Sequence, residues 1–323
     1  MHCPRLDHFV RFNYNGTVSR CGHMTNPPQF DTLAQMESSE WLTDIKNKPD
    51  AWPQECVRCQ QSESTGLKSI RQYSLDQHVK NIEVKTDYLV LGGVLDNICN
   101  SACQTCNENL STKIGSLTTQ DYIQINNSSK LDQLPLDRIV QMDINGGEPS
   151  ASPNYLRLLD NLPDNVRYLR LNTNGSRVLT ALPRLIKRGV KVTVTVSLDG
   201  IGNVHDYIRW PIKWNTVEKT IQHYQTIGLY QLNTWTTVSA LNIGDLKNIQ
   251  AYTKQHNIDH SYALLQDPDV LHVKYSNHLT RTADAPDELK SVVAQDQDNT
   301  VKLQLWTYAQ DHLRKIKLWD YYR

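Results

Sequence analysis

The chain has 323 residues, enough for one large domain and a smaller one. Lysine plus arginine equal aspartate plus glutamate, at 34 each, so no overall positive charge favours nucleic acid or an anionic bilayer as a partner. The N-terminus lacks a basic region followed by an apolar core, and no apolar stretch approaches the roughly 18 residues of a membrane span. We therefore expect a cytoplasmic protein with no membrane segment.

The segment before residue 80 is polar and interrupted by prolines, among them Pro27, Pro28, Pro49 and Pro53. The run Asn13-Tyr14-Asn15-Gly16 predicts a turn and therefore one short hairpin. No long helical or strand pattern is evident elsewhere in this segment. We expect residues 1–80 to form a small, loop-rich N-terminal domain.

After residue 80, apolar runs of strand length alternate with helical patterns. The expected strands lie near 87–94, 139–145, 166–172, 190–198, 230–238 and 259–265, and the expected helices at 155–162, 179–188, 216–227 and 245–256. This alternation is typical of an α/β fold with a parallel sheet. Six units are too few for a complete eight-stranded barrel, which usually needs about 250 residues. We expect a partial (β/α)6 TIM-like barrel over 81–270 and a C-terminal helical extension over 271–323.

The seven cysteines are confined to one part of the chain. They lie at positions 3, 21, 56, 59, 99, 103 and 106, and none follows. An odd number of cysteines at short spacings is not typical of a disulfide framework, and reducing compartments disfavour disulfides. Because soft metals select thiolates, the pattern indicates metal ligands.

The loop after the first expected barrel strand contains Cys99-Asn100-Ser101-Ala102-Cys103-Gln104-Thr105-Cys106. Three thiolates in one loop can converge on one cuboidal iron–sulfur cluster. An electron carrier normally supplies four cysteines, whereas three leave one iron open to bind a ligand, as catalytic zinc sites keep an open position. The alternative is a set of three buried or zinc-bound cysteines.

This loop resembles the signature of the radical S-adenosylmethionine (SAM) superfamily, in which three cysteines at this spacing follow the first strand. The resemblance covers most of residues 85–270. It implies that Cys99, Cys103 and Cys106 hold a [4Fe-4S] cluster whose open iron binds SAM. It also implies that one electron cleaves SAM to a 5′-deoxyadenosyl radical, which abstracts hydrogen. The residue before the third cysteine is commonly aromatic in the family and is Thr105 here.

Three further strand ends add to the resemblance. Gly146-Gly147-Glu148-Pro149 is similar to the family's motif for the SAM amino group. Adjacent glycines allow close approach of the backbone to a ligand, and a carboxylate can accept from an ammonium group. The resemblance assigns the remaining SAM contacts to Asn172, Thr173 and Asn174 at the ribose, to Ser197 and Arg209 at the carboxylate, and to Asp199.

Cys3, Cys21, Cys56 and Cys59 form a second group. Gly16 in the hairpin turn lets Cys3 and Cys21 approach each other, and Cys56 and Cys59 supply a chelating pair. From this chemistry alone, four thiolates favour structural zinc. The pattern resembles the twitch domain, a short form of the SPASM domain that usually follows the barrel, and this implies an auxiliary [4Fe-4S] cluster with no open iron. Residues expected to shape the following linker are Glu63, Gly66, Ser69 and Arg71.

With every cysteine assigned, none remains as a hydrogen-atom donor. We expect hydrogen abstraction from a small-molecule or peptide substrate and loss of a second electron to the auxiliary cluster, giving a dehydrogenation or a cross-link. The expected external electron donor is a flavodoxin or ferredoxin. Three alternatives stay open: a radical epimerase or isomerase with a tyrosine such as Tyr88 as donor, a tRNA-modifying radical SAM enzyme, which the neutral net charge disfavours, and a non-catalytic zinc-binding scaffold.

Overall fold

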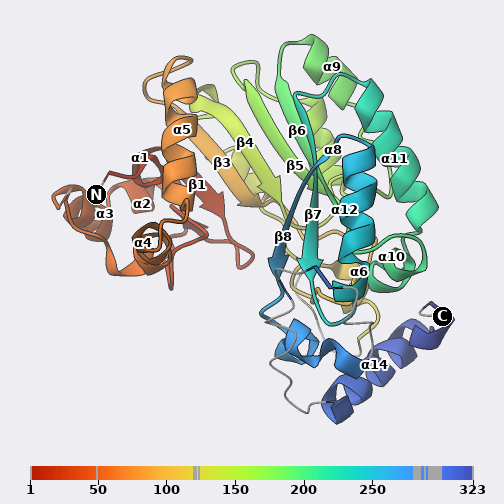
Figure 1. The fold of residues 1–323 in the computed structure, drawn as a ribbon. Coiled ribbons are helices and arrows are strands. Elements are labelled where there is room, and N and C mark those ends of the chain that lie inside the picture. The colour runs from red at the N-terminus through yellow and green to blue at the C-terminus, as the bar shows by residue number, and fades with distance from the viewer. Residues whose placement is uncertain are drawn as a thin grey trace.

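The computed structural model describes residues 2–48, 50–118, 122, 124–278, 285, 286, 289 and 300–321. Its centre is one eight-stranded sheet in the order β2-β1-β3-β4-β5-β6-β7-β8 (Figure 1). All neighbouring strands are parallel except the β1 and β2 pair. The strands are β1 (Phe9–Phe12), β2 (Val18–Ser19), β3 (Leu89–Val94), β4 (Ile139–Asn145), β5 (Tyr168–Thr173), β6 (Lys191–Ser197), β7 (Gln231–Val238) and β8 (Asp259–Leu264).

The six strands expected after residue 80 are confirmed as β3 to β8, and the helices expected between them are confirmed as a layer on one face of the sheet (Figure 1). Strand β6 illustrates this packing, because Val192, Val194 and Val196 are fully buried in the main core. Alternate residues of a strand face the same side, so the polar residues between these valines face away from the helices. The covering helices are α8 (Pro153–Asp160), α9 (Leu182–Lys187), α11 (Trp214–Thr226) and α12 (Leu246–Gln255).

The expectation of a loop-rich N-terminal segment holds only in part, because helices take up about half of the described part of residues 1–80. Ser69 caps the longest of these helices through reciprocal hydrogen bonds with Gln72, a capping box. The helix lacks a buried apolar stripe, since Tyr73 and Val79 are 56% and 60% exposed, and periodicity therefore does not reveal it. The helices are α1 (Pro4–His8), α2 (Leu33–Glu37), α3 (Glu40–Lys46), α4 (Val57–Ser64) and α5 (Ile70–Ile82).

The expected hairpin is confirmed, and it extends the sheet. Strand β1 pairs antiparallel with β2, with Arg11 opposite Ser19, and parallel with β3, with Arg11 opposite Gly92. The sheet therefore has eight strands rather than the six that the sequence predicts, because residues of the N-terminal segment join its edge. Helix α5 lies over the face opposite the main helix layer, where Asn81 Nδ2 donates to Gln141 Oε1 on β4 at 3.0 Å.

Helix α14 (Thr300–Arg314) is the principal element in the described part of the C-terminal extension, and it lies below the carboxyl ends of the strands in Figure 1. A helix therefore occupies 300–314 of the expected C-terminal extension, while residues 279–284, 287, 288 and 290–299 lie outside the described residues. Within the described ranges, no helix has both the length and the apolar composition that crossing a bilayer requires. The remaining short helices are α6 (Thr112–Gly115), α7 (Ser128–Leu131) and α10 (Asn203–Ile208).

Candidate active site

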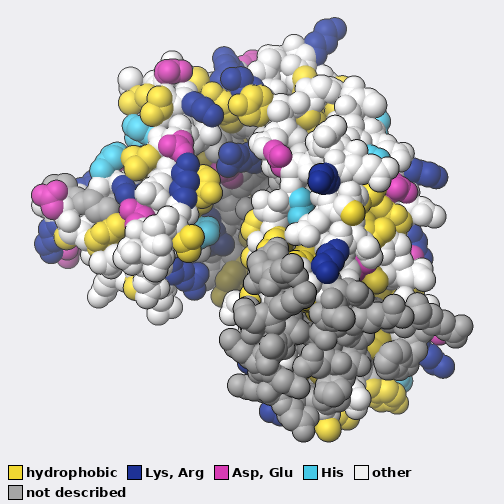
Figure 2. Space-filling view, viewed as in Figure 1, with side chains coloured by type: hydrophobic (Ala, Val, Ile, Leu, Met, Phe, Trp, Pro, Cys, Tyr) yellow, Lys and Arg dark blue, Asp and Glu magenta, His cyan; other side chains and the backbone are white. Residues whose placement is uncertain are grey.

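A cavity of about 390 Å³ lies at the carboxyl ends of strands β3 to β7. In the space-filling view the molecule is hollowed between the N-terminal helices and the rest of the sheet (Figure 2). All three cysteines of the 99–106 loop line the cavity. So does every residue expected to contact SAM except Asp199: Gly146, Gly147, Glu148, Asn172, Thr173, Asn174, Ser197 and Arg209.

The three thiols of this loop are close together, and Cys103 is buried while Cys99 and Cys106 are partly exposed. The Ser101 hydroxyl lies 3.3 Å from Cys99 Sγ and 3.4 Å from Cys103 Sγ. Burial raises the pKa of Cys99 and raises that of Cys106 to about 12, and the neighbouring thiols add to both effects. Three thiolates at this position therefore require a bound cation, which a metal centre supplies.

Segments far away in the sequence hold the backbone of the cysteine loop. Ala102 N donates to Trp210 O at 2.7 Å. From α14, Arg314 Nε donates to Ala102 O at 2.8 Å, and Arg314 Nη2 donates to Cys103 O at 3.3 Å. Arg314 is only 3% exposed. The C-terminal helix thus fixes the loop that carries the candidate ligands.

Glu148 presents a carboxylate to the cavity in a fixed orientation. Its Oε1 accepts from Thr173 Oγ1 at 2.7 Å, and its Oε2 accepts from Asn174 N at 2.6 Å. The turn before it needs glycine, because Gly147 has a φ of +57° and a Cβ there would lie 2.6 Å from Ile98 O. Ser150 N and Ser150 Oγ also donate to Oε1, at 3.0 and 2.7 Å, so Oε2, which has one donor, is the oxygen that retains capacity for an ammonium group of a ligand.

Arg209 reaches the same cavity and is oriented from below by Asp199. Its Nε and Nη2 lie 2.9 and 2.8 Å from Asp199 Oδ2, and Asp199 also accepts from Thr237 N at 2.8 Å. Asp199 is fully buried and outside the cavity lining. Burial lowers the pKa of Arg209, but the attraction of Asp199 outweighs it and the net pKa is raised. Arg209 therefore stays cationic beside Ser197 and can receive a carboxylate.

The asparagines after β4 and β5 form a polar wall of the cavity. Asn172 Nδ2 donates to Asn145 Oδ1 at 2.5 Å across the two strands. Asn174 Nδ2 donates to Asn100 Oδ1 at 2.8 Å, which ties the end of β5 to the cysteine loop. These amides offer donors and acceptors of the kind that hydroxyl groups bind.

The second cysteine group also converges. Cys3, Cys21, Cys56 and Cys59 all line one small cavity of about 20 Å³. Burial raises the pKa of Cys3 to about 11 and that of Cys56 to about 12, with the other thiols of the group adding to each shift. Arg5 Nη1 lies 3.9 Å from Cys21 Sγ. All seven cysteines of the chain are free thiols.

The residues expected to shape the segment after Cys59 hold the turn between α4 and α5. Arg71 binds Glu63 in a bidentate ion pair, with Nε to Oε1 at 2.9 Å and Nη2 to Oε2 at 2.6 Å. Ser69 Oγ donates to the same carboxylate at 2.5 Å, and Gly66 has a φ of +78°. Arg71 also lines the four-cysteine cavity. That expectation is confirmed.

The donor sets fit iron–sulfur clusters. Among the described residues, no group of three or more His, Cys, Asp or Glu side chains is arranged to hold one metal ion. A cuboidal cluster does not need its thiolates to meet at one point, because each thiolate binds a separate iron atom. The cavity at 99–106 offers three thiols, of which Cys103 is buried, next to polar side chains, and the N-terminal cavity offers four thiols.

The chain is similar to mycofactocin maturases. It is 24% identical to mycofactocin maturase MftC of Mycobacterium ulcerans (strain Agy99) over 160 residues, which are 49% of this chain and 42% of that protein. It is 25% identical to MftC of Mycobacterium tuberculosis (strain ATCC 25618 / H37Rv) over 150 residues, 46% of this chain and 37% of that protein. The match thus spans less than half the length of these curated relatives. No protein-family model matches the chain.

Two solved structures superpose on this chain with TM-scores below 0.5. Streptococcus suis SuiB bound to S-adenosylmethionine superposes with a TM-score of 0.44 and 12% identity, covering 96% of this chain and 69% of that chain. Native anSMEcpe with bound AdoMet superposes with a TM-score of 0.46 and 16% identity, covering 71% of this chain and 62% of that chain.

Several residues of the cavity are not identified by the sequence. Arg11 comes from β1, the first strand of the expected hairpin, but the sequence does not indicate that this hairpin joins the sheet. Its only local signal is the apolar run of residues 9–12 before the hairpin turn. Ser101, Asn145 and Thr237 could be found from their places in the cysteine loop and at strand ends.

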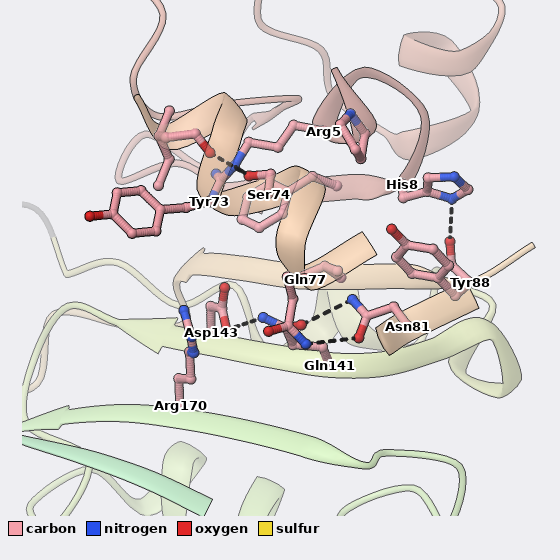
Figure 3. A pocket seen from close by; sticks show the side chains of 14 residues that line it. Arg5, His8, Tyr73, Ser74, Gln77, Asn81, Tyr88, Gln141, Asp143 and Arg170 are labelled. Atoms are coloured by element: carbon pink, nitrogen blue, oxygen red, sulfur yellow. Dashed lines mark hydrogen bonds between the residues drawn. The ribbon is translucent and has the colours of Figure 1, made fainter. Parts of the chain in front are cut away.

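Another cavity, of about 50 Å³, lies between α1, α5 and the sheet (Figure 3). It is called the smaller cavity below, and the cavity of the 99–106 loop is called the main cavity. Gln141 on β4 accepts from Asn81 and donates from Nε2 to Asp143 Oδ1 on the same strand at 2.8 Å. Asp143 is two residues before Asn145 on β4, so both cavities open on the same face of the sheet. Tyr88 lines this smaller cavity rather than the main one, with its hydroxyl 2.7 Å from His78 Nδ1.

Proposed function

We propose that this chain is a radical SAM enzyme that cleaves SAM reductively and abstracts hydrogen from a small-molecule or peptide substrate. One observation carries the proposal: the three cysteines of the 99–106 loop share a single cavity with Glu148, Arg209 and the polar ends of β4 to β6. In parallel α/β sheets, ligands bind at the carboxyl ends of the strands. The sequence similarity to mycofactocin maturases supports the same proposal.

The side chains of the cavity divide the work of binding SAM. Glu148 accepts from the amino group, while Arg209 and Ser197 bind the carboxylate and the amides at 172–174 contact the ribose. Cys99, Cys103 and Cys106 would hold the cluster, which supplies the electron that cleaves SAM to methionine and a 5′-deoxyadenosyl radical. Asp199 keeps Arg209 in place for this role.

The four-cysteine group would hold an auxiliary [4Fe-4S] cluster in a twitch-like arrangement ahead of a partial barrel. All four ligands come from the protein, so this cluster exchanges electrons rather than binding substrate. We propose that it accepts the second electron of a dehydrogenation or cross-link, and that a flavodoxin or ferredoxin supplies the first electron. Tyr88 lines the smaller cavity and not the main one, which disfavours the alternative in which it donates hydrogen.

The test is iron content together with SAM cleavage under strict anaerobic conditions. Reconstituted wild type should carry about eight iron atoms per chain and release 5′-deoxyadenosine with a strong reductant. Replacing Cys99, Cys103 and Cys106 by alanine should leave about four iron atoms and abolish SAM cleavage. Replacing Cys3 and Cys56 by alanine is the matched control, which should also lose about four iron atoms but keep reductant-driven cleavage. Two zinc ions in place of iron would contradict the proposal.

A further inference from the structure

Two arginines line the main cavity, and only one of them has an acidic partner. Arg209 is paired with Asp199 at 2.8 Å. Among the described residues, no carboxylate oxygen lies within 4.0 Å of Arg11, whose side-chain hydrogen bond goes to Asn13 Oδ1. A guanidinium stays charged in proteins. Arg11 therefore presents a positive charge to the cavity that no carboxylate of the described chain neutralises.

Glycines keep free the space that the Arg11 side chain occupies. A Cβ on Gly22 would lie 2.7 Å from Arg11 Nε, and a Cβ on Gly93 would lie 2.8 Å from Arg11 Cγ. Gly93 also has a φ of +94°, which favours glycine. Burial lowers the pKa of Arg11, opposed by the neighbouring Cys21. The side chain thus lies in a defined position between the four-cysteine group and the cavity of the three-cysteine group.

Neither charged group of SAM needs Arg11 as a partner. The proposed complex places the SAM amino group at Glu148 and the SAM carboxylate at Arg209 and Ser197, so the charged ends of that ligand are satisfied. The neighbouring Cys21 attracts Arg11 as a thiolate, but the one hydrogen bond of the guanidinium to a described residue uses Nη1, so other N–H donors can meet an anion in the main cavity. A guanidinium matches a carboxylate best, through two parallel hydrogen bonds.

We propose that Arg11 binds a carboxylate of the substrate and so holds the substrate between the two cysteine groups. This inference rests on the proposed function. The carboxylate can belong to a peptide terminus or to a small acid, because the geometry at Arg11 recognises the group and not the molecule that carries it. The N-terminal segment thereby contributes to the main cavity through β1.

The test is equilibrium dialysis of reconstituted, SAM-bound enzyme with N-acetyl-alanyl-alanine, with its C-terminal amide, and with N-acetylglycine. Wild type should bind the dipeptide acid about tenfold more tightly than the amide. Arg11→Gln should lose this preference, and Arg11→Lys should keep part of it. Arg170→Gln, in the smaller cavity, is the matched control and should retain it. If N-acetylglycine binds as tightly as the dipeptide acid, the substrate is a small acid. If only the dipeptide acid binds tightly, the substrate is a peptide. Both results support the proposal.

Iron content and SAM affinity of the same samples separate this inference from the proposed function. Wild type without iron or SAM binding would count against the proposed function itself. Arg11→Gln protein with full iron, unchanged SAM affinity and no preference for the acid supports the inference. A loss of SAM affinity of about tenfold in Arg11→Gln would place Arg11 on SAM and overturn it. The inference would also be overturned if wild type bound the dipeptide acid and its amide equally well, or bound neither.

Discussion

Replacing Arg314 should loosen the cysteine loop although the residue lies more than two hundred positions away in the chain. Arg314→Met keeps much of the side-chain volume but removes the donors to Ala102 O and Cys103 O. Hydrogen bonds from a charged donor contribute about 1.5–3 kcal/mol each, and both carbonyls would be left buried. Because the second bond is long, at 3.3 Å, we take a combined loss of about 3 kcal/mol.

Hydrogen exchange measures this loss locally. Each 1.4 kcal/mol corresponds to a factor of ten, so the amides of residues 99–106 should exchange about 100-fold faster in Arg314→Met than in wild type. Arg184→Met is the control, since the Arg184 side chain is 50% exposed beside Asp160 and its loss should leave the loop unchanged. Exchange within about threefold of wild type in Arg314→Met would refute the idea that α14 fixes the loop.

Three other changes have defined outcomes. Gly147→Ala should lower the free energy of unfolding in urea by about 1–3 kcal/mol, because its Cβ meets the Ile98 carbonyl, whereas Gly189→Ala, with open space around it, should cost less. Glu148→Gln should weaken SAM binding about tenfold in equilibrium dialysis, and unchanged binding would exclude the ammonium contact. Burial, aided by Arg209, lowers the pKa of His205 to about 3, so its neutral form stabilises the fold above pH 6.5 and this contribution falls as pH falls toward 3. The free energy of unfolding of wild type should therefore be about 1.4 kcal/mol lower at pH 5.5 than well above pH 6.5, and His205→Phe should lack this decrease. If urea unfolding gives the same change with pH in both proteins, the reasoning is contradicted.

The sheet and the main cavity could be predicted because their signals are local. Strands β4, β5 and β6 end at the polar residues Asn145, Thr173 and Ser197, and parallel strands bring those ends to one edge. The resemblance to the radical SAM superfamily assigns roles to Glu148, Asn172 and Ser197, and all three line the main cavity. The spacing of Cys99, Cys103 and Cys106 indicates an iron–sulfur cluster at this edge.

What the sequence does not reveal depends on contacts between distant segments. Arg11 reaches the cavity only because β1 pairs with β3, some eighty residues further along the chain. Arg314 reaches the cysteine loop across 211 residues. Asp199 resembles a ligand in the sequence, but its burial beneath Arg209 makes it a support. Helix α5 exposes Tyr73 and Val79 and contacts the sheet through Asn81, so no apolar period predicts it.

The pairing of β1 with β3 has a consequence for how this protein can be divided. A strand edge stripped of its neighbour exposes a row of unpaired backbone groups, which invites aggregation. Cutting the chain near residue 80 would strip β3 in this way and would also remove Phe9 from its contact with Val90 and Tyr88. The N-terminal segment is therefore not a detachable module, and a chimaera that exchanges it for a relative's segment would fold only if the replacement restored a matching edge strand.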